Sequence, residues 1–257
     1  MPLQDVLLLI VAGLAGGTIS ALVGGAALVT FPALLATGLA PIPAAAANLV
    51  ALAPGNLLAA LSDRSQLPPL DRSFIGLVLA SLIGAAIGAS LLLVTPERVF
   101  ALLVPLLLGF ATILFAVSPQ VSAWLRARAA ARGHTGPYRW GNSIAALLPV
   151  SVYGGYFGAG VGVLLVAVLS IATAGDYRRA NATKNLVTAF NGLAAIMVFA
   201  ARGGIDWPAT GAMMSGALLG SLVGARIARH APRELMRFVV VAIGALLTIV
   251  YAWRYWF

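Results

Sequence analysis

The chain has 257 residues, of which 61% are hydrophobic and only 9% are charged, and its mean hydropathy is +1.00. Because soluble globular proteins carry about 25% charged residues, the composition excludes that class and predicts an integral membrane protein. The absence of cysteine excludes a disulfide framework, a thiolate metal site and a cysteine nucleophile. The formal net charge of +9 could suggest nucleic acid, but Lys and Arg concentrated in cytoplasmic loops explain it better, so we expect no nucleic-acid partner.

Two copies of one unit make up the sequence. Asn48-Leu49-Val50 matches Asn185-Leu186-Val187, a separation of 185 − 48 = 137 residues, and Gly25 matches Gly162 at the same offset. We therefore predict a first transmembrane repeat at 1–117, an Arg-rich cytoplasmic linker at 118–141 and a second transmembrane repeat at 142–257. Each repeat divides into five apolar segments, expected at 6–23, 26–37, 44–61, 73–94 and 99–117, and at 143–159, 161–173, 180–201, 208–227 and 235–253.

The lengths of these segments predict the fold class. The third, fourth and fifth segments of each repeat are near the roughly 20 residues that a helix needs to cross a bilayer. The second segments, 26–37 and 161–173, are too short to cross upright as helices. We predict an all-α integral membrane protein with two inverted repeats, each made of a broken or re-entrant hairpin and about three spanning helices.

The distribution of arginine predicts the orientation in the membrane. If the linker is cytoplasmic and each repeat crosses three times, twelve arginines lie inside and three outside. The inside set is Arg64, Arg72, Arg126, Arg128, Arg132, Arg139, Arg178, Arg179, Arg226, Arg229, Arg233 and Arg237, and the outside set is Arg98, Arg202 and Arg254. This bias is typical of cytoplasmic loops. We therefore expect a multi-pass protein of the bacterial inner membrane with both termini external.

Small residues recur every four positions in the fourth segment of each repeat. These residues are Gly76, Ala80, Gly84 and Gly88 in the first repeat, and Ala212, Gly216, Gly220 and Gly224 in the second. Small residues at this spacing let helix backbones approach closely in lipid. We interpret both rows as packing surfaces.

The joints between the first two segments of each repeat are rich in glycine, at Gly24-Gly25 and from Gly158 through Gly160 to Gly162. Such a joint before a short helix can direct free backbone N–H groups at an anion. Glycine can also simply permit a tight turn and close packing, and both interpretations stay open. Interrupted segments at corresponding positions of two repeats indicate a transport site, so Gly24, Gly25, Gly160 and Gly162 are candidate substrate-binding residues.

The third segments carry polar side chains. Asn48 and Asn185 occupy matching positions, and Asn191 follows in the second repeat. Lys184 is the only lysine, and its counterpart at 184 − 137 = 47 is Ala47. A lysine near a helix N-terminus opposes the helix dipole, so something anionic should compensate it. We predict that Asn48, Lys184, Asn185 and Asn191 bind the substrate; the alternatives are interhelical hydrogen bonds for the amides and snorkelling to the interface for the lysine.

Acidic residues are absent from the middle of every predicted span. They fall at segment ends or in loops, at Asp5, Asp63, Asp71, Glu97, Asp176, Asp206 and Glu234. A carboxylate proton relay is therefore not expected, and the sequence has no phosphate-binding loop for ATP. His134 and His230 are expected in loops. With no nucleophile–base or metal-ligand constellation, we expect no catalytic residue, no metal, no cofactor and no enzymatic activity.

Short glycine motifs carry a resemblance to a known family. The second half reads Gly203-Gly204-Ile205-Asp206-Trp207 and then Gly220-Ser221-Leu222-Val223-Gly224-Ala225-Arg226, and in the first half Gly24-Gly25 precedes Pro32. With these motifs the chain resembles the sulfite exporter family TauE/SafE, also called the toluene sulfonate uptake family, over nearly its whole length. It departs from the family pattern at Ala26-Ala27, where glycines are expected, and at Leu169, where proline is expected.

The resemblance implies a secondary transporter that exports or imports a small sulfur-containing anion, such as sulfite, sulfoacetate or another organosulfonate, by alternating access. The departures leave open a different substrate within the family. The expected partners are the small anion and the lipid bilayer, and a homodimer is left open. Two other classes remain as alternatives: an anion channel with the same site and, less favoured, a membrane-embedded enzyme or assembly partner.

Overall fold

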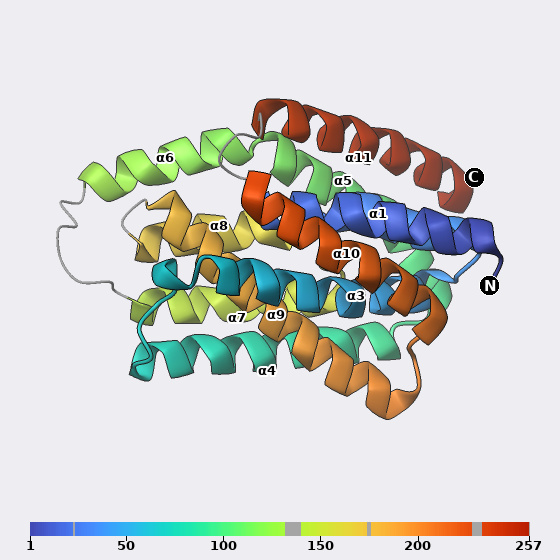
Figure 1. Cartoon of the computed structure of the whole chain (residues 1–257), viewed down its shortest axis with the longest axis horizontal. Helices are drawn as coiled ribbons and strands as arrows, with labels where there is room; N and C mark the ends of the chain where they lie inside the picture. The colour runs from blue at the N-terminus through green and yellow to red at the C-terminus, as the bar shows by residue number, and fades with distance from the viewer. Residues whose placement is uncertain (23, 132–139, 174–175, 228–232, 257) are drawn as a thin grey trace.

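The computed structural model describes residues 1–22, 24–131, 140–173, 176–227 and 233–256 (Figure 1). Within these residues the regular elements are eleven α-helices and one short 3-10 helix, with no strand. The first half contains α1 (Leu3–Leu22), α2 (Ala27–Ala36), α3 (Pro41–Ser62), η1 (Arg64–Gln66), α4 (Arg72–Val94) and α5 (Glu97–Ala116). Then follow α6 (Ser118–Ala131), α7 (Trp140–Tyr156), α8 (Val161–Ala172), α9 (Tyr177–Arg202), α10 (Trp207–Ile227) and α11 (Arg233–Trp256).

The helix lengths confirm the predicted all-α membrane class. Six helices are long and apolar enough to cross a membrane by length and composition, namely α1, α3, α4, α5, α9 and the part of α11 from Arg237. The segments predicted to be too short for an upright crossing, α2 and α8, have 10 and 12 residues. The fourth segment of the second repeat forms α10, which has 21 residues and is not among those six.

The helices of the two halves pack in corresponding pairs. α1 packs along α10 just as α7 packs along α4, and α3 crosses α9 in the middle of the molecule while α5 lies along α11. Figure 1 shows both termini at one end of the molecule, where α1 and α3 begin, whereas α7 and α9 begin toward the opposite end. The inverted relation of the repeats and the domain boundaries at 117 and 142 stay predictions.

Part of the predicted linker is helical. The Arg-rich segment begins with the 14 residues of α6, which packs against α8. The linker residues 132–139, which include His134, lie outside the described residues, as does His230.

Acidic side chains at segment ends cap helix N-termini. Asp71 accepts a hydrogen bond from the Phe74 N–H at the start of α4 (2.9 Å), and Asp206 accepts one from the Ala209 N–H at the start of α10 (3.0 Å). Asp176 accepts from the first turn of α9, at 3.0 and 3.2 Å. These carboxylates satisfy N–H groups that a helix leaves without internal partners, which explains why they lie at helix starts and not in mid-span.

The two rows of small residues form the tightest helix contacts. A methyl group added at Gly216 or Gly220 of α10 would overlap a backbone carbonyl of α1, at Ile10 or Leu14. The matching row on α4 makes the same kind of contact: a methyl group at Gly88 would overlap a backbone carbonyl of α7. The packing interpretation of both rows is thus confirmed.

Candidate functional site

Each hairpin breaks at left-handed glycines in the interior of the protein. Gly24 and Gly25 between α1 and α2 have φ angles of 80° and 90°, and Gly158 and Gly160 between α7 and α8 have φ angles of 80° and 75°. Side chains disfavour this conformation, so the breaks require glycine. The same backbone bond ends both helices, because the Gly24 N–H donates to the carbonyl five residues back (3.0 Å), as the Gly158 N–H does (3.3 Å).

This hydrogen-bond pattern corrects the alignment of the two joints. It pairs Gly24 with Gly158, a separation of 158 − 24 = 134 residues, three fewer than the offset of 137 between Asn48 and Asn185. The second hairpin is therefore three residues longer between its joint and α9. Gly162 does not stand opposite Gly25; it lies in the first turn of α8, where a methyl group on Gly24 would come within 3.0 Å of the Gly162 Cα. The joints of the two halves thus touch each other.

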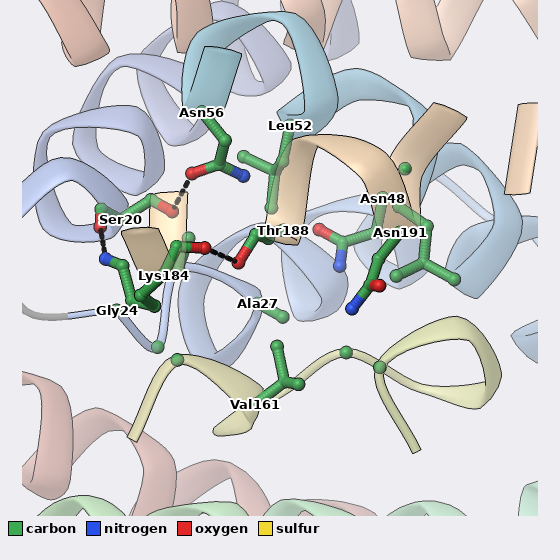
Figure 2. A pocket seen from close by; sticks show the side chains of 17 residues that line it. Ser20, Gly24, Ala27, Asn48, Leu52, Asn56, Val161, Lys184, Thr188 and Asn191 are labelled. Atoms are coloured by element: carbon green, nitrogen blue, oxygen red, sulfur yellow. Dashed lines mark hydrogen bonds between the residues drawn. The ribbon is translucent and has the colours of Figure 1, made fainter. Parts of the chain in front are cut away.

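A small cavity lies where the joints meet α3 and α9. The volume open to the centres of water-sized molecules is about 40 Å³, room for about three waters at 10–15 Å³ each. Figure 2 shows Ser20, Gly24 and Lys184 on one side of it, Asn48 and Asn191 on the other, and Val161 of α8 between them.

The cavity brings together most of the predicted site residues. Its lining includes six of the eight, namely Gly24, Gly25, Asn48, Gly162, Lys184 and Asn191. The other two lie outside it. Gly160 packs against Ala111 of α5, and the buried side-chain oxygen of Asn185 has no hydrogen-bond partner among the described residues. Substrate binding by any of the eight residues stays a prediction.

Sequence reasoning left other polar lining residues off the predicted site. The Ser20 hydroxyl donates to the side-chain oxygen of Asn56 (2.7 Å), and the Thr188 hydroxyl donates to the Lys184 carbonyl (2.8 Å). Asn56 and Thr188 lie one or two helical turns from Asn48 and Lys184, so their spacing on the same helices was a usable signal. Ser20 carried no such signal, since α1 contains no asparagine or lysine.

Lys184 is buried at this cavity. Only 1% of its surface is exposed, so it does not snorkel to the interface, and its ammonium donates to the Ser20 carbonyl at 2.7 Å. Among the described residues no carboxylate lies within 4.0 Å of the ammonium. An ammonium has three N–H donors, and one is engaged here.

Three side chains on one face of α9 cap the broken end of α1. They donate to its last carbonyls: Lys184 to Ser20 at 2.7 Å, Asn181 to Ala21 at 3.2 Å and Tyr177 to Leu22 at 3.1 Å. The final carbonyls of a helix lack internal donors and carry partial negative charge, so a cation there is favourable. The negative group expected to compensate Lys184 is therefore, at least in part, the C-terminal end of α1.

Comparison with known proteins places the chain in a family. The family model described as "Sulfite exporter TauE/SafE" matches residues 9–251. The chain is 25% identical to the "Probable membrane transporter protein" of Haemophilus influenzae, over 92% of this chain and 90% of the relative. It is also 25% identical to the "Probable membrane transporter protein YfcA" of Escherichia coli, over 96% of this chain and 89% of the relative. No solved structure matches. The match over nearly the whole chain shows that this multi-pass membrane protein belongs to the TauE/SafE family, a family of transporters and not of enzymes.

Proposed function

We propose that the protein transports a small sulfur-containing anion, such as sulfite, sulfoacetate or another organosulfonate, across the bacterial inner membrane through the cavity at the two joints. The observation that carries the proposal is the buried Lys184 ammonium, which lines this cavity with no carboxylate within 4.0 Å among the described residues. A buried cation without a paired anion is costly. A bound anion would remove that cost.

Neutral donors around the cavity favour an oxyanion. The side-chain oxygen of Asn56 already accepts from Ser20, which leaves its amide nitrogen free to donate. Asn191 has no partner for either amide atom among the described residues. At the start of α8, the described residues offer no backbone acceptor to the Gly162 N–H, as is usual in the first turn of a helix. N–H groups at this positive helix end are suited to anionic oxygens.

The size of the cavity favours a small substrate. Its volume of about 40 Å³ suits an anion of a few heavy atoms, and an organosulfonate with a longer tail requires the cavity to widen. Widening on one side and then the other is what alternating access by two inverted repeats would provide. The corresponding packing of α1 on α10 and of α7 on α4 supports such a two-part mechanism.

The charges in the spans agree with passive export. Moving one negative charge out of an inside-negative cell releases about 2.3 kcal/mol per 100 mV, so export needs no proton relay. An anion channel is the alternative. The contact between the two joints favours a carrier, because a channel needs a continuous path.

The test combines binding with exchange. We expect sulfite or an organosulfonate to raise the melting temperature of the purified protein in a saturable way, with sulfate and chloride weaker. In proteoliposomes we expect the same anion, unlabelled inside, to accelerate uptake of labelled anion. Unitary currents without counter-exchange would favour the channel, and no stabilisation by any sulfur anion would contradict the proposed substrate class.

A further inference from the structure

The two broken helix ends at the cavity differ in charge. The end of α1 is capped by a resident cation, Lys184, and by the neutral donors of Asn181 and Tyr177. At the offset of 137 that relates α3 to α9, the residues that match these three donors are Ala40, just before α3, and Ala44 and Ala47 within it. None of these alanines can donate a side-chain hydrogen bond. One half therefore supplies a built-in cation where the other half supplies methyl groups.

The broken end of α7 is left with bare carbonyls. At the joint offset of 134, the capped carbonyls of Ser20, Ala21 and Leu22 correspond to those of Gly154, Gly155 and Tyr156. No side chain among the described residues donates to these three carbonyls, and the N–H groups just beyond the helix do not reach them: the Phe157 and Gly158 N–H groups both donate to Tyr153. Two residues of this end, Gly154 and Gly158, line the cavity.

An unpartnered amide packs against this end of α7. Asn191 is only 2% exposed, lines the same cavity, and has no hydrogen-bond partner for its oxygen or its nitrogen among the described residues. It packs directly on Gly154, because a methyl group there would lie 2.7 Å from the amide nitrogen. The nitrogen is the amide atom nearer Gly154, but the two ends of the amide are interchangeable by rotation, so a bound partner decides which atom faces the helix end. A buried amide left unpaired is costly, and a ligand bound at this end of the cavity would relieve that cost.

We propose that a sodium ion binds between the C-terminal end of α7 and the side-chain oxygen of Asn191. The donor set is neutral oxygen only, which suits a hard monovalent cation, and C-terminal ends of broken helices coordinate such ions in secondary transporters. The ion would take, in the second half, the place that the Lys184 ammonium holds in the first.

This inference rests on the proposed function, to whose site it adds a bound cation. A substrate anion in the cavity would then lie between two positive charges, the Lys184 ammonium and the sodium ion. Each would strengthen the binding of the other, and the linkage must be reciprocal.

The experiment measures sodium binding without the sulfur anion. The purified protein is melted in equal concentrations of sodium, potassium and N-methyl-glucamine chloride, and binding of radioactive sodium is titrated. We expect saturable sodium binding and stabilisation specific to sodium. Asn191→Leu should weaken sodium binding at least about tenfold. Thr183→Val is the matched control, since Thr183 is a buried polar residue on the same helix away from this cavity, and it should keep the parent affinity.

A second variant keeps the proposal testable should Asn191→Leu fail to fold. Asn191→Asp replaces the amide by a carboxylate of the same shape, so we expect tighter sodium binding and weaker binding of the sulfur anion. Equal stabilisation by all three salts, or parent sodium affinity in folded Asn191→Leu or Asn191→Asp, would overturn the site. Anion binding measured in potassium chloride separates the two ideas: if it persists while sodium has no effect, the sodium site fails and the proposed anion transport stands.

Discussion

At the residue scale, Lys184 has two roles, and a single substitution changes both at once. Its ammonium caps the Ser20 carbonyl at the end of α1, and the same group lines the cavity proposed for the anion. Loss of the side chain therefore removes a helix cap and a substrate charge together. Asn181 separates the roles, because it caps the neighbouring Ala21 carbonyl at 3.2 Å without lining the cavity.

We predict that Lys184→Ala lowers anion affinity strongly, since a hydrogen bond to a charged group is worth about 1.5–3 kcal/mol, or about 10- to 150-fold. Lys184→Arg should recover part of the affinity, limited by its wider planar head. Asn181→Ala should lower stability by about 1 kcal/mol, the net value of a neutral hydrogen bond, and leave affinity unchanged. Anion titrations and melting curves of the three folded variants check this. An affinity for Lys184→Ala within about twofold of the parent would remove the lysine from the site.

At this scale the sequence predicted site residues from their unusual chemistry. The sole lysine and the repeated asparagine lie inside apolar segments, and both Lys184 and Asn48 line the cavity. Their partners were not predictable. Lys184 binds a backbone carbonyl, which every residue has, and only the crossing of α1 by α9 selects Ser20. Asn185 occupies the matching repeat position and looked as good a candidate as Asn48 in the sequence, but its position on α9 places it outside the lining of the cavity.

At the element scale, close helix contacts depend on glycine where backbones touch. Gly220 of α10 faces the Leu14 carbonyl of α1, whereas Gly211 of the same helix has no neighbouring atom within 4 Å of an added methyl group. The spacing predicted these contacts because only small residues allow such an approach in lipid. The three-residue difference between the hairpins was not predictable, since the repeat was aligned on α3 and α9, where the sequence match is strong.

We predict that Gly220→Leu destabilises the protein, because the side chain must force α1 and α10 apart, and overpacking costs about 1–3 kcal/mol. Gly211→Leu is the matched control on the same helix and should melt within a degree or two of the parent, since surface changes are usually within about 0.5 kcal/mol. Melting temperatures in detergent are the measurement. If Gly220→Leu keeps the parent melting temperature but loses transport, the glycine acts in function and not in packing.

At the scale of the whole molecule, the positions of the helix ends and of the arginines concern the orientation of the protein in the membrane. Figure 1 shows α1, α3 and both termini starting or ending at one end, with α6 toward the other. The predicted inside set of arginines flanks helix ends such as the starts of α4 and α9, at Arg72 and Arg178. The fold could be predicted this far because each span is a long apolar run. The helix lengths do not indicate which end faces the cytoplasm. Only the distribution of arginine between the two ends predicts that.

The orientation gives the last prediction, that both termini are external and the start of the linker is cytoplasmic. The chain has no cysteine, so a single introduced cysteine is the only site that a thiol reagent can label. Gln4 near the N-terminus and Gln120 at the start of α6 are both exposed glutamines, which makes Gln4→Cys and Gln120→Cys a matched pair. An impermeant maleimide should label Gln4→Cys in intact spheroplasts and Gln120→Cys only after permeabilisation, with the parent as the blank. The twelve-to-three arginine bias is the physical reason, because positive loops resist translocation.

Labelling of Gln120→Cys but not Gln4→Cys in intact spheroplasts would show that the orientation is the reverse of the predicted one. Labelling of both would place the termini and the linker on one side and so contradict an odd number of crossings in the first repeat.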